Sequence, residues 1–202
     1  LKNSFKKEGF REANISIYFH LKRNNINNKL IKRLIEENTP QQQNLDVELN
    51  QELKGHEINE VANLMTTLLN DIQRLDNYQT FNETPERIQR VVEHHKKSNN
   101  NSFHLLLRNK EKELIGISIV VFKKENPTSV NQFMTGVLKE YRGLGLPTWM
   151  KAYMYDYLQK HYPTIELIKT DCFSGNLPMI HINKKMGFEE AYRSTEMVYE
   201  KN

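Results

Sequence analysis

A short glycine-containing segment stands between a predicted strand and the clearest predicted helix of the chain. It holds Arg142, Gly143 and Gly145, and the helix follows from Leu146. Glycine lets the backbone approach a ligand closely because it has no side chain. The first N–H groups of a helix lack partners within the helix and point out of its positive end, where phosphate binds favourably. With the charge of Arg142 beside them, these amides predict a site for a diphosphate.

Two common phosphate-binding motifs do not fit this segment. It lacks the third glycine of a dinucleotide-binding fingerprint and the Gly-Lys-Ser/Thr of a P-loop. Pro147 has no N–H to donate, although its fixed φ suits the first turn of a helix. A strand-to-helix turn that binds no ligand is the alternative, and the two glycines alone do not decide between the two interpretations.

Apolar spacing on either side of the segment predicts a mixed α/β domain over residues 45–202. Recurrence every three or four positions indicates helices, and alternation indicates strands. The predicted order is strand 45–53, helix 57–76, a helix from Thr84-Pro85, strands 103–108, 114–123 and 130–138, helix 146–160, strand 165–173, helix 178–186 and strand 190–200. We therefore expect a mostly antiparallel sheet with one local parallel pair and helices on both faces.

The first 44 residues predict a different organisation. Residues 1–9 form a short basic helix that Gly9 ends, and residues 10–21 alternate weakly as a strand. Residues 24–44 are rich in Asn and Gln and predict a linker with one short helix at 29–37. The chain begins with Leu1 rather than Met, which suits a fragment or a trimmed chain.

Composition narrows the function classes. The 202 residues carry a net charge of +4, from 29 Lys and Arg against 25 Asp and Glu, and the two signs are interleaved. This slight excess does not favour nucleic-acid binding and suits a small anionic cofactor equally well. No apolar run approaches the ~20 residues that span a membrane. The single cysteine, Cys172, favours a reducing, cytoplasmic setting, and no Cys/His pattern has zinc spacing.

Around its glycines the chain resembles the GNAT acetyltransferases. Their motif, Gln/Arg-x-x-Gly-x-Gly/Ala between a strand and a helix, reads here Arg142-Gly-Leu-Gly-Leu-Pro147. Pro147 departs from the usual Gly or Ala and removes one donor. A second motif follows at the distance expected for the family, with Asn176 before a short helix that ends in Gly187-Phe188.

The resemblance implies a GNAT fold over residues 45–202 and binding of acetyl-coenzyme A. The residues that it implies for cofactor binding are Val137, Arg142, Gly143, Leu144, Gly145, Leu146, Pro147, Thr148 and Asn176. Within the family, the tandem GNAT proteins, the class that includes mycothiol synthase, are the most similar. The segment Phe5 to Phe10 resembles the same helix-Gly-Phe ending, so residues 1–23 are expected to close a preceding GNAT domain. An ordinary N-terminal extension is the alternative.

The resemblance also implies catalytic positions. Asp171 lies where several GNAT enzymes carry a glutamate, so it is the candidate general base, unless it is a solvated carboxylate at a strand end. Asn183 occupies the position of the family's frequent tyrosine acid. An asparagine donates a hydrogen bond but delivers no proton. Tyr192 and Tyr199 are conceivable substitutes, although core or edge-strand packing explains both more simply.

Three other features favour structural roles over functional ones. Cys172 has no base beside it in sequence, and His181 fits a solvent-facing position on its helix. The aromatic spacing of Trp149, Tyr153 and Tyr157 is typical of core packing.

Two functions follow. The first is an N-acetyltransferase that moves acetyl from acetyl-CoA to a small-molecule or peptide amine by direct attack. The second is a catalytically silent CoA-binding module, which Asn183 favours. We expect no nucleic-acid or membrane partner, and contact with a preceding GNAT domain. The loop at residues 70–83 is a candidate for acceptor binding because Asp71, Asp76 and Glu83 could attract an amine.

Overall fold

A computed structural model describes residues 2–37, 39–76 and 79–199. Some predicted segments include positions that lie outside the described residues, namely Leu1, Asn38, Asn77, Tyr78 and residues 200–202. The elements are α1 (Lys2–Lys7), β1 (Phe10–Lys22), α2 (Asn28–Glu36), β2 (Asp46–Asn50), α3 (Gly55–Asn70), α4 (Pro85–Lys97), β3 (Asn100–Arg108), β4 (Leu114–Lys123), β5 (Ser129–Val137), α5 (Leu146–His161), β6 (Leu167–Phe173), α6 (Leu177–Lys185) and β7 (Glu189–Tyr199), with short 3₁₀ turns at Arg23–Asn25, Pro40–Gln43 and Lys139–Tyr141.

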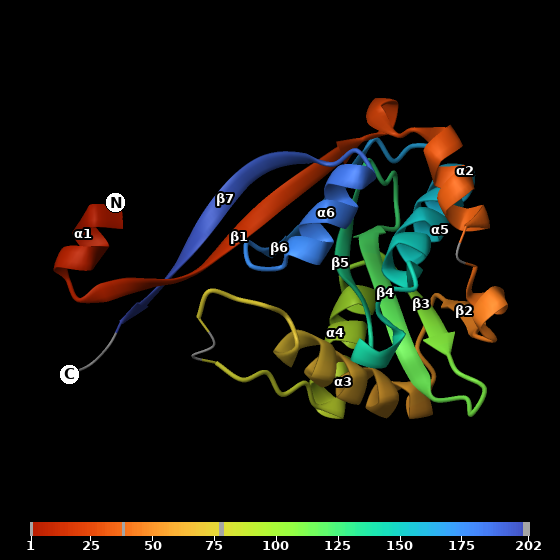
Figure 1. Cartoon of the computed structure of the whole chain (residues 1–202), viewed down its shortest axis with the longest axis horizontal. Coiled ribbons are helices and arrows are strands. Elements are labelled where there is room, and N and C mark those ends of the chain that lie inside the picture. Colours follow the sequence, from red (N-terminus) through yellow and green to blue (C-terminus); the bar gives the residue numbers. More distant parts are fainter. Residues whose placement is uncertain (1, 38, 77–78, 200–202) are drawn as a thin grey trace.

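Seven strands form one mixed sheet in the order β2-β3-β4-β5-β6-β1-β7. The pair β5–β6 is parallel, as the β5-α5-β6 connection requires, and the other pairs are antiparallel. Helices α3 and α4 cover one face of the sheet, and α2 and α5 cover the other (Figure 1). The predicted fold class is confirmed.

Most element boundaries agree with the local signals in the sequence. Thr84 caps α4 by accepting a hydrogen bond from the Arg87 amide at 3.3 Å, with Pro85 in the first turn. Gly9 has a φ of +87° two residues after the end of α1, where glycine ends a helix at low cost. The helix predicted to reach residue 76 ends instead at Asn70, and Asp71 occupies its C-cap.

The boundaries predicted at residues 23 and 44 do not divide the sheet or its core. β1 pairs on one side with β6, where Ile17 faces Cys172, and on the other with β7, where Tyr18 faces Tyr192. The predicted linker contains α2, whose Ile31 and Leu34 are buried. Amphipathic spacing makes α2 a packed helix rather than a spacer. The origin of residues 1–23 in a preceding domain stays a prediction.

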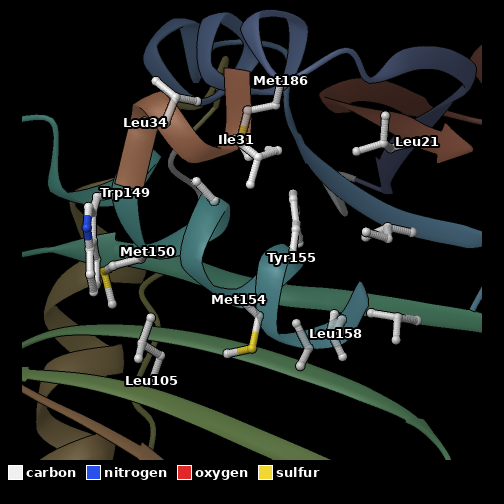
Figure 2. Close-up of a cluster of buried hydrophobic side chains, with 14 of the residues drawn as sticks. Leu21, Ile31, Leu34, Leu105, Trp149, Met150, Met154, Tyr155, Leu158 and Met186 are labelled. Carbon is white, nitrogen blue, oxygen red and sulfur yellow. The ribbon is translucent and has the colours of Figure 1, made fainter. Parts of the chain in front are cut away.

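The larger core lies between the sheet and α2, α5 and α6. Figure 2 shows Ile31 and Leu34 on α2, Met186 at the end of α6 and Leu21 of β1 around the side chains of α5. Trp149 stacks on Tyr153 with ring centres 5.0 Å apart, which confirms core packing for this aromatic spacing. The helix α5 is thereby fixed against the sheet, and its first turn lies at the end of β5.

Candidate functional site

The strands β5 and β6 separate partway along their length. Their pairing runs from Ser129 with Leu167 to Gln132 with Thr170 and then stops, although β5 continues to Val137. Among the described residues, no strand pairs with β5 on its β6 side beyond Gln132. A backbone that lacks a strand partner on one side can hydrogen-bond a ligand. We call this opening, between 133–137 of β5 and 171–173 of β6, the fork.

A bulge in β5 marks the start of the fork. The register of β5 with β4 shifts between Gln132 and Met134, so Phe133 is the extra residue. A bulge bends its strand away from the regular ladder. The buried Gln132 holds the bend, because its Nε2 donates to Ser118 Oγ at 3.0 Å and to Thr135 Oγ1 at 3.1 Å.

The predicted phosphate segment lies at the end of β5. Gly143 and Gly145 have φ values of +80° and +74°, a left-handed conformation that favours glycine. Gly145 is the N-cap of α5, and no side chain caps the helix. A Cβ built on Gly143 would meet nothing within 4 Å. The positive end of α5 is therefore uncapped beside open space, which fits a diphosphate.

The other predicted cofactor residues are arranged around the fork. Val137 is buried at the end of β5, and Leu144 is exposed with its carbonyl accepting from Gln43 Nε2 at 3.3 Å. Leu146, Pro147 and Thr148 form the first turn of α5. Asn176 caps α6 by accepting from the Met179 amide at 3.3 Å, so its Oδ1 has a structural partner.

Arg142 is paired across the molecule. Its Nη2 lies 3.1 Å from Asp71 Oδ2 at the end of α3. The spacing in the sequence gave no sign of this pair, because its members are 71 residues apart. The cation beside the phosphate segment is therefore held by the loop that follows α3.

The loop at residues 70–83 does not offer unpaired carboxylates. Asp71 pairs with Arg142, Asp76 pairs with Arg11, and Glu83 lies 3.1 Å from Arg87 and is largely buried. Each negative charge is already opposed by an arginine. The expected attraction of an amine by these residues is therefore not favoured by the geometry.

Asp171 and Cys172 follow the last β5–β6 pair and point to opposite faces of the sheet, as neighbours in a strand must. Cys172 packs into the core on the α5 face, and burial raises the pKa of its thiol to about 11. This confirms a structural role. Asp171 reaches solvent on the α3 face, yet desolvation by its surroundings raises its pKa, in the direction that suits a base.

Asn183 is completely buried on α6, where it faces α5. Its Oδ1 accepts a hydrogen bond from Lys151 Nζ at 2.7 Å. The sequence did not single out Lys151, because a lysine beside an apolar stripe is expected to face solvent. In the structure, α5 is buried on nearly all sides, and Lys151 is buried with it. Tyr192 and Tyr199 are exposed on the edge strand β7, and His181 is exposed on α6, as expected for structural or solvent-facing side chains.

A polar cavity of about 270 Å³ lies elsewhere, where His95, Asn100 and His104 line the space between α4 and β3. None of the predicted cofactor residues lines this cavity. Among the described residues, no helix has the length and apolarity needed to cross a membrane.

Solved structures with a similar fold include GNAT proteins. A tandem GNAT protein from the clavulanic acid biosynthesis pathway matches 94% of this chain and 55% of its own, with 18% identity and a TM-score of 0.67. A GCN5-related N-acetyltransferase from Sphaerobacter thermophilus matches 96% of this chain and 53% of its own, with 9% identity and a TM-score of 0.63. A spermidine N-acetyltransferase chimera from Vibrio cholerae matches 74% of this chain and 82% of its own, with 18% identity and a TM-score of 0.52.

This chain spans about half the length of the first two proteins. No family model and no curated protein matches the sequence. The parallel pair β5–β6 and the glycine segment before α5 lie in the region that carries the sequence motifs. The chain therefore has the fold of the GNAT N-acetyltransferases.

Proposed function

We propose that this chain binds acetyl-CoA in the fork and transfers the acetyl group to an amine by direct attack. The observation that carries the proposal is the uncapped start of α5, with Gly143 and Gly145 left-handed, at the open end of the fork. The amides of this turn would hold the diphosphate. The free side of β5, which ends at Val137, would hold the pantetheine arm.

The two faces of the fork suit different tasks. Acetyl-CoA supplies a thioester, which is an activated acyl group. Asp171 on the α3 face would accept the proton of the attacking amine, directly or through a water. The raised pKa of Asp171 favours this, since a more basic carboxylate is a better proton acceptor. Asn183 on the opposite side could donate a hydrogen bond but no proton.

Calorimetry combined with a thiol-release assay tests the proposal. We expect heat when CoA or acetyl-CoA is titrated into the folded protein, and thiol release with at least one of a panel of polyamines, amino sugars and peptide N-termini. Binding without release from any of them would favour the second candidate, a silent CoA-binding module, which Asn183 at the acid position supports. A folded protein that gives no heat with CoA would contradict both.

The partners belong to the same proposal. An amine acceptor and a reducing, cytoplasmic setting are what an acetyl-CoA-dependent enzyme with one buried cysteine would have. A preceding GNAT domain is supported by the match to about half of a tandem GNAT protein. To test this contact, the chain would be produced with and without such a domain. Hydrogen exchange would then show whether part of the surface becomes protected when the domain is present.

A further inference from the structure

The loop between α3 and α4 carries one basic residue, Arg74. Its guanidinium carbon lies 4.7 Å from the centre of the Phe81 ring and 6.0 Å from the centre of the Phe173 ring on β6. Aromatic faces hold a guanidinium in place but leave the N–H donors in its plane free for a carboxylate or a phosphate. The loop therefore presents a fixed cation at the end of β6.

Among the described residues, Arg74 has no acidic partner. The three carboxylates of the same loop, on Asp71, Asp76 and Glu83, are each opposed by another arginine. Of the three guanidinium nitrogens of Arg74, only Nε is buried without a hydrogen-bond partner. The two terminal nitrogens remain open to a ligand. Because arginine forms its strongest hydrogen bonds with anions, this cation lacks the kind of group that it binds best.

The cation lies on the same face of the sheet as the candidate base. Asp171 and Phe173 are two residues apart in β6, so both side chains point to the α3 face, at positions about 7 Å apart along the strand. Arg74 approaches Phe173 from this face. The region beside the fork thus combines one carboxylate, which suits an amine, with one cation, which suits an acid group.

Contacts on both sides of Arg74 hold its loop against β6 and β1. A Cβ built on Gly175 would lie 2.8 Å from the carbonyl oxygen of Gln73, so the loop comes as close as it does because this position is a glycine. On the other side, the Asn14 side chain accepts from the Asp76 amide at 3.0 Å and donates to the Asp76 carbonyl at 3.1 Å. The position of Arg74 is therefore fixed by the backbone on either side of it.

We infer that Arg74 binds an acid group on the acceptor, so the substrates of this chain are amines that also carry a carboxylate or a phosphate, such as amino acids, rather than polyamines. The inference rests on the proposed function. With its acid group on Arg74, the acceptor places its amine beside Asp171. The amine nitrogen bonds to the acetyl carbon and loses a proton to Asp171. The carbon–sulfur bond breaks, and sulfur keeps the bonding pair and takes a proton from water.

Matched pairs of acceptors test the inference in the thiol-release assay. L-Leucine and isoamylamine differ by a carboxylate, as do L-ornithine and putrescine, and glucosamine 6-phosphate and glucosamine differ by a phosphate. In each pair that the enzyme accepts, we expect the acid-bearing member to have a kcat/KM at least about tenfold higher, because hydrogen bonds between charged groups are strong. The pairs that respond identify the acid as carboxylate or phosphate.

Arg74→Gln should abolish this preference. The kcat/KM of the acid-bearing acceptor should fall at least about tenfold, and that of its matched amine should change less than about twofold. A loosened loop would affect both members of a pair alike, so their ratio separates binding of the acid group from a structural role. Arg74→Lys keeps the charge without the planar pair of donors and should retain part of the preference. Arg33→Gln, which removes an exposed arginine from α2 on the other face of the sheet, is the control and should retain all of it.

Two results would overturn the inference while leaving acetyl transfer in place. One is an equal or higher kcat/KM for the amines that lack an acid group, and the other is a preference that persists in Arg74→Gln. Release from no amine at all, by protein that binds CoA, would instead contradict the proposed transfer, and the inference would fall with it. The two kinds of failure are therefore distinguishable.

Discussion

Asp71 at the end of α3 holds the guanidinium of Arg142 at 3.1 Å, beside the glycine segment proposed for diphosphate. The two side chains are 37% and 45% exposed, so the pair adds little to stability. The carboxylate also competes with an incoming phosphate for the arginine.

Asp71→Asn should therefore tighten CoA binding, by about threefold at low ionic strength and less at high salt, since salt screens exposed charges. Calorimetry at two salt concentrations measures the effect. Asp156→Asn, which breaks the pair with Lys160 near the far end of α5, is the matched control and should change nothing. Weaker binding by Asp71→Asn would show that the pair organises the segment rather than competing with the ligand.

Gly143→Ala should weaken CoA binding at least about tenfold and cost about 1 kcal/mol of stability. The added methyl group has open space in the free protein but would occupy the position proposed for the diphosphate. Gly9→Ala is the control for affinity, because Gly9 also has a left-handed φ, of +87°, and lies between α1 and β1 rather than beside α5; its added methyl group would also press on the Tyr199 ring, 3.2 Å away. Equal affinities of the two variants would place the ligand elsewhere.

Lys151 should make the protein less stable at neutral and acidic pH. The unfolded lysine titrates near 10.5 and the folded one near 7. The unfolded state thus binds more protons between these values, and stability rises with pH across this window. Lys151→Met should flatten this rise. Even with the cost of leaving Asn183 Oδ1 without its partner, the variant should be about 2 kcal/mol more stable than the wild type at pH values below 7. Denaturant midpoints against pH test this, and an unchanged slope would contradict it.

His104 should limit stability in acid. It is buried on β3, where desolvation lowers its pKa from 6.5 to about 4, against a backbone hydrogen bond with Asn50 that raises it. The unfolded histidine takes up a proton first as pH falls, so stability is lost between about 6.5 and 4. His104→Gln should keep about 2 kcal/mol more of its neutral-pH stability near pH 4 than the wild type does. His56→Gln, at an exposed position, should leave the profile unchanged. Parallel acid profiles of the wild type and His104→Gln would contradict the prediction.

β1 should be inseparable from the rest of the domain. Phe19 is fully buried in the same core as Trp149, the single tryptophan. Phe19→Leu should lower the free energy of unfolding, followed by tryptophan fluorescence, by about 1–2 kcal/mol. Phe5→Leu, at an exposed site on α1, should leave this free energy unchanged. An unchanged free energy of unfolding in Phe19→Leu would mean that β1 unfolds independently.

Local signals explain what could be predicted. Periodicity placed the strands and helices, and the glycines around Leu144 marked the start of α5 because left-handed φ values select glycine. Long-range pairing left no local signal. The alternation in β1 indicates a strand but not its neighbours, and Ile72 continues the spacing of α3 although the helix ends at Asn70.

The candidate site was predictable to the same depth. The turn that starts α5 follows from Gly143 and Gly145, whose left-handed φ values favour glycine, while binding of a diphosphate there stays a prediction. The pairs Asp71–Arg142 and Lys151–Asn183 do not follow from the sequence, because each joins residues that only the folded chain brings together. A lysine beside an apolar stripe looks solvent-facing until the neighbouring helix α6 covers it.

The position of β1 ties its folding to the synthesis of β6 and β7. This strand is translated well before its two neighbours in the sheet, β6 and β7. Until they emerge, both edges of β1 are open to pairing with other nascent chains. Newly made protein should therefore depend on chaperones until β7 is translated.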